Sequence, residues 1–213
     1  MKATGKMLKI WDPVVRVGHW VLVIAFFTAY LTEDDFLTLH VWAGYLVGSI
    51  VCLRLLWGII GSKHAKFKDF VYSPAITLQY ILDLIGGHAK RFIGHNPAGG
   101  AMVLALLIAL TATVSSGLML YAIEENAGPL AEWVAESSES SSKPALMSRA
   151  LADEDRHNDD SREELWEELH EFFANLTLLL VGLHIAGVLF SSYAHKENLI
   201  KSMFTGRKRS DPD

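Results

Sequence analysis

The sequence predicts an all-α integral membrane protein built as a four-helix bundle. Of its 213 residues, 51% are hydrophobic, and the apolar residues gather in four segments of about 18 residues or more, long enough for a helix to cross a bilayer. Membrane-crossing strands would be shorter and would alternate polar with apolar side chains. We therefore expect a single domain over residues 1–213, with spans at about 14–31, 36–60, 98–123 and 172–193.

The short flanks of the spans predict their orientation. Basic residues lie in the N-terminal segment, in the connection 61–97 and after the last span, whereas the connection 32–38 holds three acidic residues and no basic one. Because cytoplasmic flanks of membrane proteins carry the excess of Lys and Arg, we expect both termini to be cytoplasmic.

The connection between the third and fourth spans is strongly acidic. Residues 124–168 hold 14 Asp and Glu against four Lys and Arg, a net charge of −10. We interpret this outer loop either as a solvated surface or as a surface that steers a basic soluble partner. Its Ser-rich centre, 136–142, predicts disorder, and residues 163–168 are expected to extend the fourth helix.

Cysteine chemistry is largely excluded, because Cys52 is the sole cysteine and lies within an apolar segment. This rules out intrachain disulfides, Cys-based zinc or iron–sulfur sites, and covalent c-type haem attachment. Metal binding would then depend on the nine histidines.

Four histidines form two pairs by depth in the membrane. His170 and His184 are 14 residues apart on the fourth segment, so they share one helix face and are separated by about 21 Å. His40, near the outer start of the second segment, matches the depth of His170, and His19, at the inner start of the first, matches that of His184. Two neutral imidazoles on opposed helices suit the two axial positions of a haem iron. We predict two haems stacked across the bilayer.

Nearby residues fit these sites. Gly44 and Gly48 follow the second-segment histidine and would leave room for a flat macrocycle, although helix packing explains them equally well. Arg54, at the depth of the inner pair, and Arg16, one turn before the first histidine, could each pair with a haem propionate. The alternative for both arginines is anchoring at the cytoplasmic interface.

A structural zinc site is disfavoured, because it needs four ligands clustered at one depth. The remaining histidines are interpreted as surface residues: His64, His88, His95, His157 and His195.

Several motifs resemble the bacterial cytochrome b561 and Ni,Fe-hydrogenase b-type cytochrome superfamily. Two of them are the R-x-x-H-W pattern at 16–20 and the H-N-P-x-G pattern at 95–99. A third is the segment that starts at His40 and contains Gly44-Tyr45, Arg54 and Trp57-Gly58. The fourth is the pair of histidines in the last span. The resemblance extends over about residues 9–209 and omits the acidic loop.

The resemblance implies a four-helix membrane cytochrome with two non-covalent haem b groups in the bacterial cytoplasmic (inner) membrane. In the similar cytochrome b subunit of formate dehydrogenase, helices one and four hold the inner haem, and helices two and four hold the outer one. An Asn at the start of helix three lies near quinone in that relative, which implies Asn96 here. A purely structural reading of Asn96-Pro97 is a helix start.

We therefore expect an electron-transfer protein, or the cytochrome b subunit of an oxidoreductase, that connects the quinone pool with a periplasmic c-type cytochrome or dehydrogenase. No catalytic residue and no nucleic-acid partner is predicted. One alternative is a stand-alone quinol–superoxide oxidoreductase, which the acidic outer loop disfavours because it would repel superoxide. The other is a non-redox membrane protein that binds metal ions.

Overall fold

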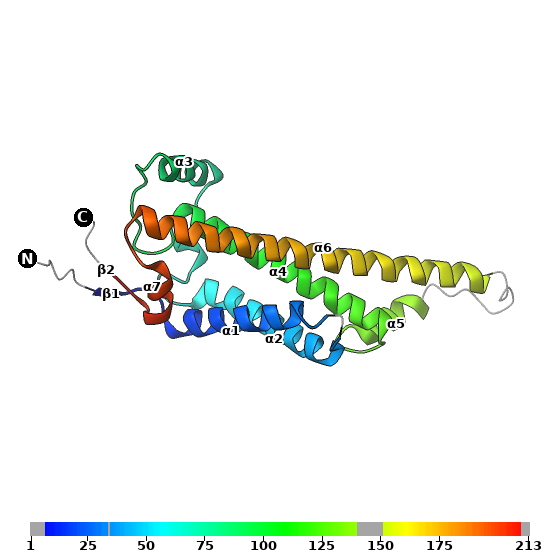
Figure 1. The fold of residues 1–213 in the computed structure, drawn as a ribbon. Helices are drawn as coiled ribbons and strands as arrows, with labels where there is room; N and C mark the ends of the chain where they lie inside the picture. Colours follow the sequence, from blue (N-terminus) through cyan, green and yellow to red (C-terminus); the bar gives the residue numbers. More distant parts are fainter. Residues whose placement is uncertain (1–6, 34, 140–150, 210–213) are drawn as a thin grey trace, which may run out of the picture. The chain divides into compact units, whose positions relative to one another are not determined.

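The computed structural model describes residues 7–33, 35–139 and 151–209 (Figure 1). Within these residues the chain is mainly helical, with one short pair of strands. The helices are α1 (Pro13–Tyr30), α2 (Leu37–Ile60), α3 (Pro74–Ile85), α4 (Pro97–Glu124), α5 (Ala131–Glu139), α6 (Leu151–Ala194) and α7 (Leu199–Thr205). A 3₁₀ turn covers Phe67–Asp69, and the strands are β1 (Met7–Lys9) and β2 (Arg207–Arg209).

Four of the described helices are long and apolar enough to cross a membrane: α1, α2, α4 and the Ser161–Ala194 part of α6. This confirms the four predicted spans, and the first three begin and end within one residue of the predicted limits. Their outer faces keep large apolar side chains exposed, such as Trp42 at 68% and Ile108 at 70%. Such faces suit contact with lipid, because a membrane helix does not need protein to cover its apolar surface.

The acidic loop is more helical than the sequence predicted. Helix α6 begins at Leu151, so the expected extension at 163–168 is confirmed and continues further toward the N-terminus. Residues 151–168 include five Glu, a residue that favours helix. The disorder predicted for 136–142 is wrong for 136–139, which end α5, and residues 140–142 lie outside the described residues.

The chain divides into two compact units, Met1–Ile108 with Leu178–Asp213, and Ala109–Thr177. In the first unit α1 and α2 lie side by side (Figure 1). The buried apolar side chains of the two helices include Ala25, Phe26, Ala43 and Val47. In the second unit α4 and α6 pack through the hydroxyls of Thr113 and Thr177, 3.2 Å apart.

A polar junction fixes the start of α1 to the end of α2. Asp12 caps α1 by accepting a hydrogen bond from the backbone N–H of Val15 at 2.9 Å. Its second carboxylate oxygen accepts from Trp57 Nε1 at 3.1 Å and from the hydroxyl of Ser62. Burial alone would raise the pKa of Asp12, but these hydrogen bonds outweigh it and lower the pKa. Pro13, at the first helical position, gives up no hydrogen bond by lacking an N–H.

The two ends of the chain are joined by the strand pair. Strands β1 and β2 are antiparallel, with Lys9 opposite Arg207. The backbone N–H of Ile10 donates to the carbonyl of Gly206 at 2.8 Å. This pairing holds α7 close to the start of α1.

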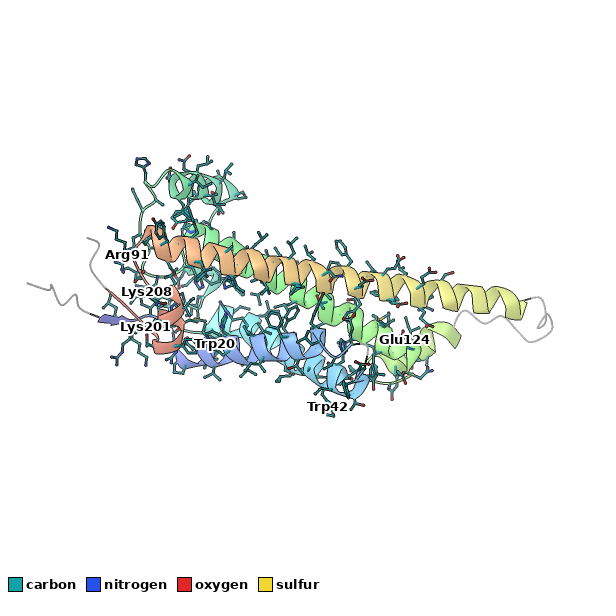
Figure 2. The ribbon with its side chains drawn as sticks, in the orientation of Figure 1. Trp20, Trp42, Arg91, Glu124, Lys201 and Lys208 are labelled. Atoms are coloured by element: carbon teal, nitrogen blue, oxygen red, sulfur yellow. The ribbon has the colours of Figure 1, made fainter. Side chains whose placement is uncertain are left out.

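A partly buried ion cluster holds the same end of the first unit together. Arg91 Nη2 lies 2.8 Å from Glu197 Oε1, and Lys208 Nζ lies 3.5 Å from Glu197 Oε2. Figure 2 shows Arg91, Lys201 and Lys208 gathered in this region. The cluster connects the segment before α4, the segment after α6 and strand β2.

Candidate functional site

His19 on α1 and His184 on α6 form a close pair within the first unit. Their ring centroids are 6.5 Å apart, and the ring planes are inclined by 54°. His19 Nδ1 is buried and has no hydrogen-bond partner among the described residues. Metal–imidazole bonds of about 2 Å place the centroids of two rings on opposite sides of one metal roughly 6 Å apart. The pair therefore has the separation expected of two ligands to a single metal.

His95 lies near this pair and corrects a prediction. The sequence suggested a surface residue, but the ring packs against Trp11 and Phe70, with centroid distances of 4.6 Å in both cases. Its Nδ1 is buried without a hydrogen-bond partner in the described part of the chain. Burial first, and then the nearby positive charge of Arg54, lower the pKa of His95 to about 3. His95 is therefore a neutral, enclosed imidazole at neutral pH.

The two arginines differ in their surroundings. The Arg54 guanidinium lies over the rings of Phe67 and Phe70 at 5.5 and 5.7 Å and donates to the carbonyl of Ala65 at 3.1 Å. The Arg16 guanidinium instead donates to the backbone carbonyls of Met203, at 3.3 Å, and Phe204. Arg16 therefore binds carbonyl groups at the C-terminal end of α7 in this structure. That Arg16 also binds a haem propionate stays a prediction.

His40, in the first unit, is oriented by backbone. Its Nδ1 lies 2.9 Å from the carbonyl oxygen of Ala29 on α1. A carbonyl can only accept, so Nδ1 carries the proton and the ring lone pair lies on Nε2, the nitrogen that binds metals in this tautomer. Gly44 follows one turn later, and an added Cβ there would meet nothing within 4 Å. The roles of Gly44 and Gly48 beside a haem stay predictions.

His170, in the second unit, is oriented in the same way. Its Nδ1 lies 3.0 Å from the carbonyl of Thr113 and 3.2 Å from the hydroxyl of Ser116. The ring lies directly against Gly117, where an added Cβ would be 2.7 Å from His170 Cε1. Gly117 was not singled out in the sequence, since only its packing against this ring reveals its importance.

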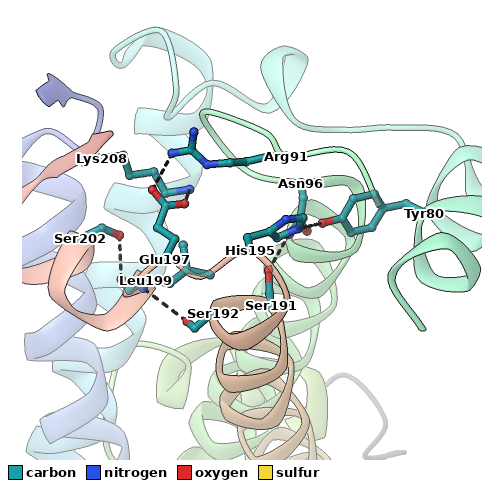
Figure 3. Close-up of polar contacts among 10 residues, drawn as sticks. All are labelled: Tyr80, Arg91, Asn96, Ser191, Ser192, His195, Glu197, Leu199, Ser202 and Lys208. Carbon is teal, nitrogen blue, oxygen red and sulfur yellow. Dashed lines mark hydrogen bonds and ion pairs between the residues drawn. The ribbon is translucent and has the colours of Figure 1, made fainter. Parts of the chain in front are cut away.

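Asn96 belongs to a polar cluster at the start of α4 (Figure 3). Its Oδ1 caps the helix by accepting from the N–H of Gly99 at 2.7 Å, which agrees with the helix-start interpretation. Its Nδ2 lies 3.5 Å from the hydroxyl of the buried Ser191. The hydroxyl of Tyr80 lies 3.2 Å from His195 Nε2. Burial raises the pKa of Tyr80, although hydrogen bonds with Ser191 and Asn96 oppose this shift.

The cluster brings together residues that the sequence analysis did not connect. Tyr80 comes from the amphipathic helix α3 and is 5% exposed. Its contact with His195 spans 115 positions in the sequence. His195 was interpreted as a surface residue, and it is in fact partly buried and bound to Tyr80.

Among the residues with described side chains, no group of three or more His, Cys, Asp and Glu lies close enough together to hold a metal ion. The candidate metal ligands described above are the His19–His184 pair and the single histidines His40 and His170.

Comparison with known proteins identifies the family. The family model described as prokaryotic cytochrome b561 matches residues 10–206. No curated protein and no solved structure matches the chain. The match confirms the family that the motifs suggested, and with it haem b as the cofactor type. The chain belongs to the prokaryotic cytochrome b561 family and is a membrane b-type cytochrome of electron transfer.

Proposed function

We propose that this cytochrome holds two haem b groups and carries electrons between the quinone pool and a periplasmic redox partner. The observation that carries the proposal is the His19–His184 pair, whose ring centroids are 6.5 Å apart. That separation matches two axial imidazoles on one haem iron. His19 and His184 would hold the inner haem.

The outer haem is assigned to His40 and His170. Each of these rings directs Nδ1 at a backbone carbonyl, of Ala29 and of Thr113 respectively. A histidine that ligates a metal usually donates its other ring N–H in this way, which fixes its tautomer and raises its basicity as a ligand. The assignment of these two residues to one haem comes from their matching depth in the sequence.

Haem b supplies one-electron transfer at its iron. The chain would hold each haem with two histidines, and its apolar helix faces would keep water away. Arg54 is our proposed partner for a propionate of the inner haem, because it lies on α2 14 residues after His40, at the depth of the inner histidine pair, and Arg binds carboxylates bidentately. Two histidines at each haem would favour electron transfer over binding of oxygen or substrate at the iron.

Quinone is assigned to the region of Asn96. The carbonyl oxygen of this amide is occupied by Gly99, so its Nδ2 is the group that would donate a hydrogen bond to a quinone carbonyl. Tyr80 and Ser191 place further hydroxyls in the same cluster (Figure 3). By the distribution of basic flanks, this end faces the cytoplasm and the acidic segment 124–168 faces a soluble partner outside.

The haem count and the inner ligand pair are tested by absorption spectroscopy of the purified protein. The wild type should bind two haems per chain with a bis-histidine b-type spectrum. The His184→Ala variant should keep one haem, because only the inner site loses a ligand. His88→Ala, at an exposed histidine, is the matched control and should keep both. A single haem in the wild type would contradict the proposal.

The quinone assignment is tested separately with Asn96→Ser. Serine also caps a helix N-terminus, so α4 should start as before while the amide donor is lost. We expect slower reduction of the haems by quinol and an unchanged spectrum after chemical reduction. Asn198→Ser makes the same replacement at the cap of α7 and should leave quinol reduction unchanged. Equal rates in the Asn96 variant and the wild type would rule out this amide as a quinone contact.

A further inference from the structure

Tyr80 places a buried hydroxyl beside the proposed quinone contact. Its ring packs against Phe92 with the centroids 5.6 Å apart, and its hydroxyl is hydrogen-bonded with the side chains of Ser191 and Asn96. Burial raises the pKa of Tyr80 against these hydrogen bonds, so the hydroxyl keeps its proton at neutral pH. This hydroxyl therefore lies next to the amide that we assign to quinone (Figure 3).

His195 connects the hydroxyl of Tyr80 with the surface of the protein. Its Nε2 lies 3.2 Å from the Tyr80 hydroxyl, and the residue is partly exposed, whereas Tyr80 is 5% exposed. An imidazole nitrogen at hydrogen-bond distance from a hydroxyl is a suitable acceptor for its proton. Asn96, Tyr80 and His195 therefore form a continuous path of polar groups from the proposed quinone contact to accessible surface.

The surroundings of His195 keep its ring neutral at neutral pH. Burial lowers the pKa of His195, the charge of Glu197 opposes this shift, and the charges of Lys208 and Arg91 add to it. Residues 210–213, which follow β2, lie outside the described residues. A neutral imidazole can take up a proton and release it again near pH 7.

We propose that Tyr80 and His195 carry away the protons that a quinol releases when it is oxidised at Asn96. This role rests on the quinone assignment made above. Oxidation of one quinol yields two electrons and two protons. The electrons pass one at a time to ferric haem iron and then to the periplasmic redox partner of the proposed function.

Each proton leaves through both residues in turn. The quinol O–H bond breaks and its proton goes to the Tyr80 oxygen, while the hydroxyl proton of Tyr80 goes to His195 Nε2. The imidazolium then releases its Nδ1 proton to water. The neutral ring regains the Nδ1–H tautomer by exchange with water before the second proton leaves by the same path.

The proposal is tested by stopped-flow reduction of the haems by quinol, with full-length protein in detergent, on both sides of neutral pH. The wild type should react faster as the pH rises and more slowly in D₂O. His195→Gln can still accept the hydrogen bond from Tyr80 through its amide oxygen but cannot take up a proton. It should react about 100-fold more slowly and lose the pH dependence, with unchanged haem content and unchanged affinity for a quinone analogue.

Tyr80→Phe should have the same effect as His195→Gln, and the double variant should be no slower than either single one, because both residues act in one path. Added imidazole should accelerate the reaction of His195→Ala and leave that of the wild type unchanged, which a purely structural role would not produce. Tyr72→Phe is the matched control, since this tyrosine contacts the same Phe92 ring with the centroids 6.0 Å apart. It should react at the wild-type rate.

The outcomes separate the proton path from the quinone assignment. Wild-type rates in Tyr80→Phe and His195→Gln, together with slow reduction in Asn96→Ser, would overturn the proton path and leave the quinone contact in place. Wild-type rates in all three variants would overturn both. Slow reduction of Tyr80→Phe and His195→Gln with the wild-type pH profile would also overturn the proton path, because the two residues would then only shape the site.

Discussion

The histidines that we propose for the inner and the outer haem are positioned in two different ways. His19 and His184 are brought within 6.5 Å of each other by the packing of their helices, and no backbone group of the described chain holds His19 Nδ1. His170 is instead held locally, by the carbonyl of Thr113 and the hydroxyl of Ser116, with its ring against Gly117. Substitutions that loosen contacts at the helix ends should therefore weaken haem binding at the inner site. Substitutions of single residues on α4 should weaken haem binding at the site of His170.

The largest expected effect is that of Gly117→Leu. Since even a Cβ here would come within 2.7 Å of His170 Cε1, a leucine must displace the ring from its carbonyl partner. We expect the haem content to fall from two per chain to one, with the inner haem spectrum retained. Haem quantification and reduced-minus-oxidised spectra measure this outcome.

Gly182→Leu is the matched control for Gly117→Leu. It lies on α6, where an added Cβ meets nothing within 4 Å, and it is about 200° around the helix from His184. Both haems should be retained in this control. If Gly117→Leu also keeps both haems, the ring of His170 does not need its observed position.

Local patterns were sufficient to predict the four spans, and they are the basis of the proposal for the four histidines. Hydropathy and length defined the helices, and the 14-residue spacing of His170 and His184 placed both on one face of α6. These features depend on helix periodicity, which can be recognised within a short stretch of sequence. The predicted limits of the first three spans are correct to within one residue for the same reason.

The features that were missed depend on contacts between distant segments. His95 resembles a loop histidine in sequence, but Trp11 and Phe70 enclose it. Tyr80 and His195 are 115 positions apart, and the two strands pair the opposite ends of the chain. No local sequence pattern predicts such long-range contacts, because they depend on how the helices and their connections pack.

Asp12→Ala should produce the next largest effect, this time at the inner site. It removes the cap of α1 and leaves Trp57 Nε1 without its acceptor. Loss of a cap costs about 1 kcal/mol, and the lost hydrogen bond of the partly buried Trp57 donor adds about 1 kcal/mol. We expect a lower melting temperature, with the inner haem released before the outer one during heating.

Asp12→Asn refines this test. The amide oxygen can still cap Val15, but the amide nitrogen cannot accept from Trp57 or Ser62, so the variant should melt between the wild type and Asp12→Ala. Release of the outer haem first would contradict the view that the inner site depends on the helix ends.

A smaller, pH-dependent effect is expected at Glu197. Burial alone would raise the pKa of Glu197, but the hydrogen bond from Arg91 and the charge of Lys208 outweigh it and lower the pKa below 4.5. A carboxylate with a lowered pKa stabilises the fold above its unfolded value, and this stabilisation is lost as the pH falls through the folded value. The melting temperature of the wild type should therefore fall as the pH is lowered below about 4.5.

Glu197→Gln should melt lower than the wild type at neutral pH and should show a shallower decline below about pH 4.5. Thermal unfolding followed across this range compares the two. Parallel curves for both proteins would show that the ion pairs of Glu197 do not contribute to acid sensitivity.

The smallest effect is expected from Ser116→Ala, which removes one of the two contacts to His170 Nδ1. The carbonyl of Thr113 remains at 3.0 Å, so the ring should keep its place and both haems should be retained. Because a hydrogen bond accepted from Nδ1 raises the basicity of a ligating histidine and favours ferric iron, its loss should raise the midpoint potential of the outer haem. We expect a shift of less than about 60 mV, which is a tenfold change for one electron. Redox titration against Ser49→Ala, at an exposed serine on α2, measures it. A shift of the inner haem instead would mean that His170 belongs to the inner site, and the distinction between the two sites would fail.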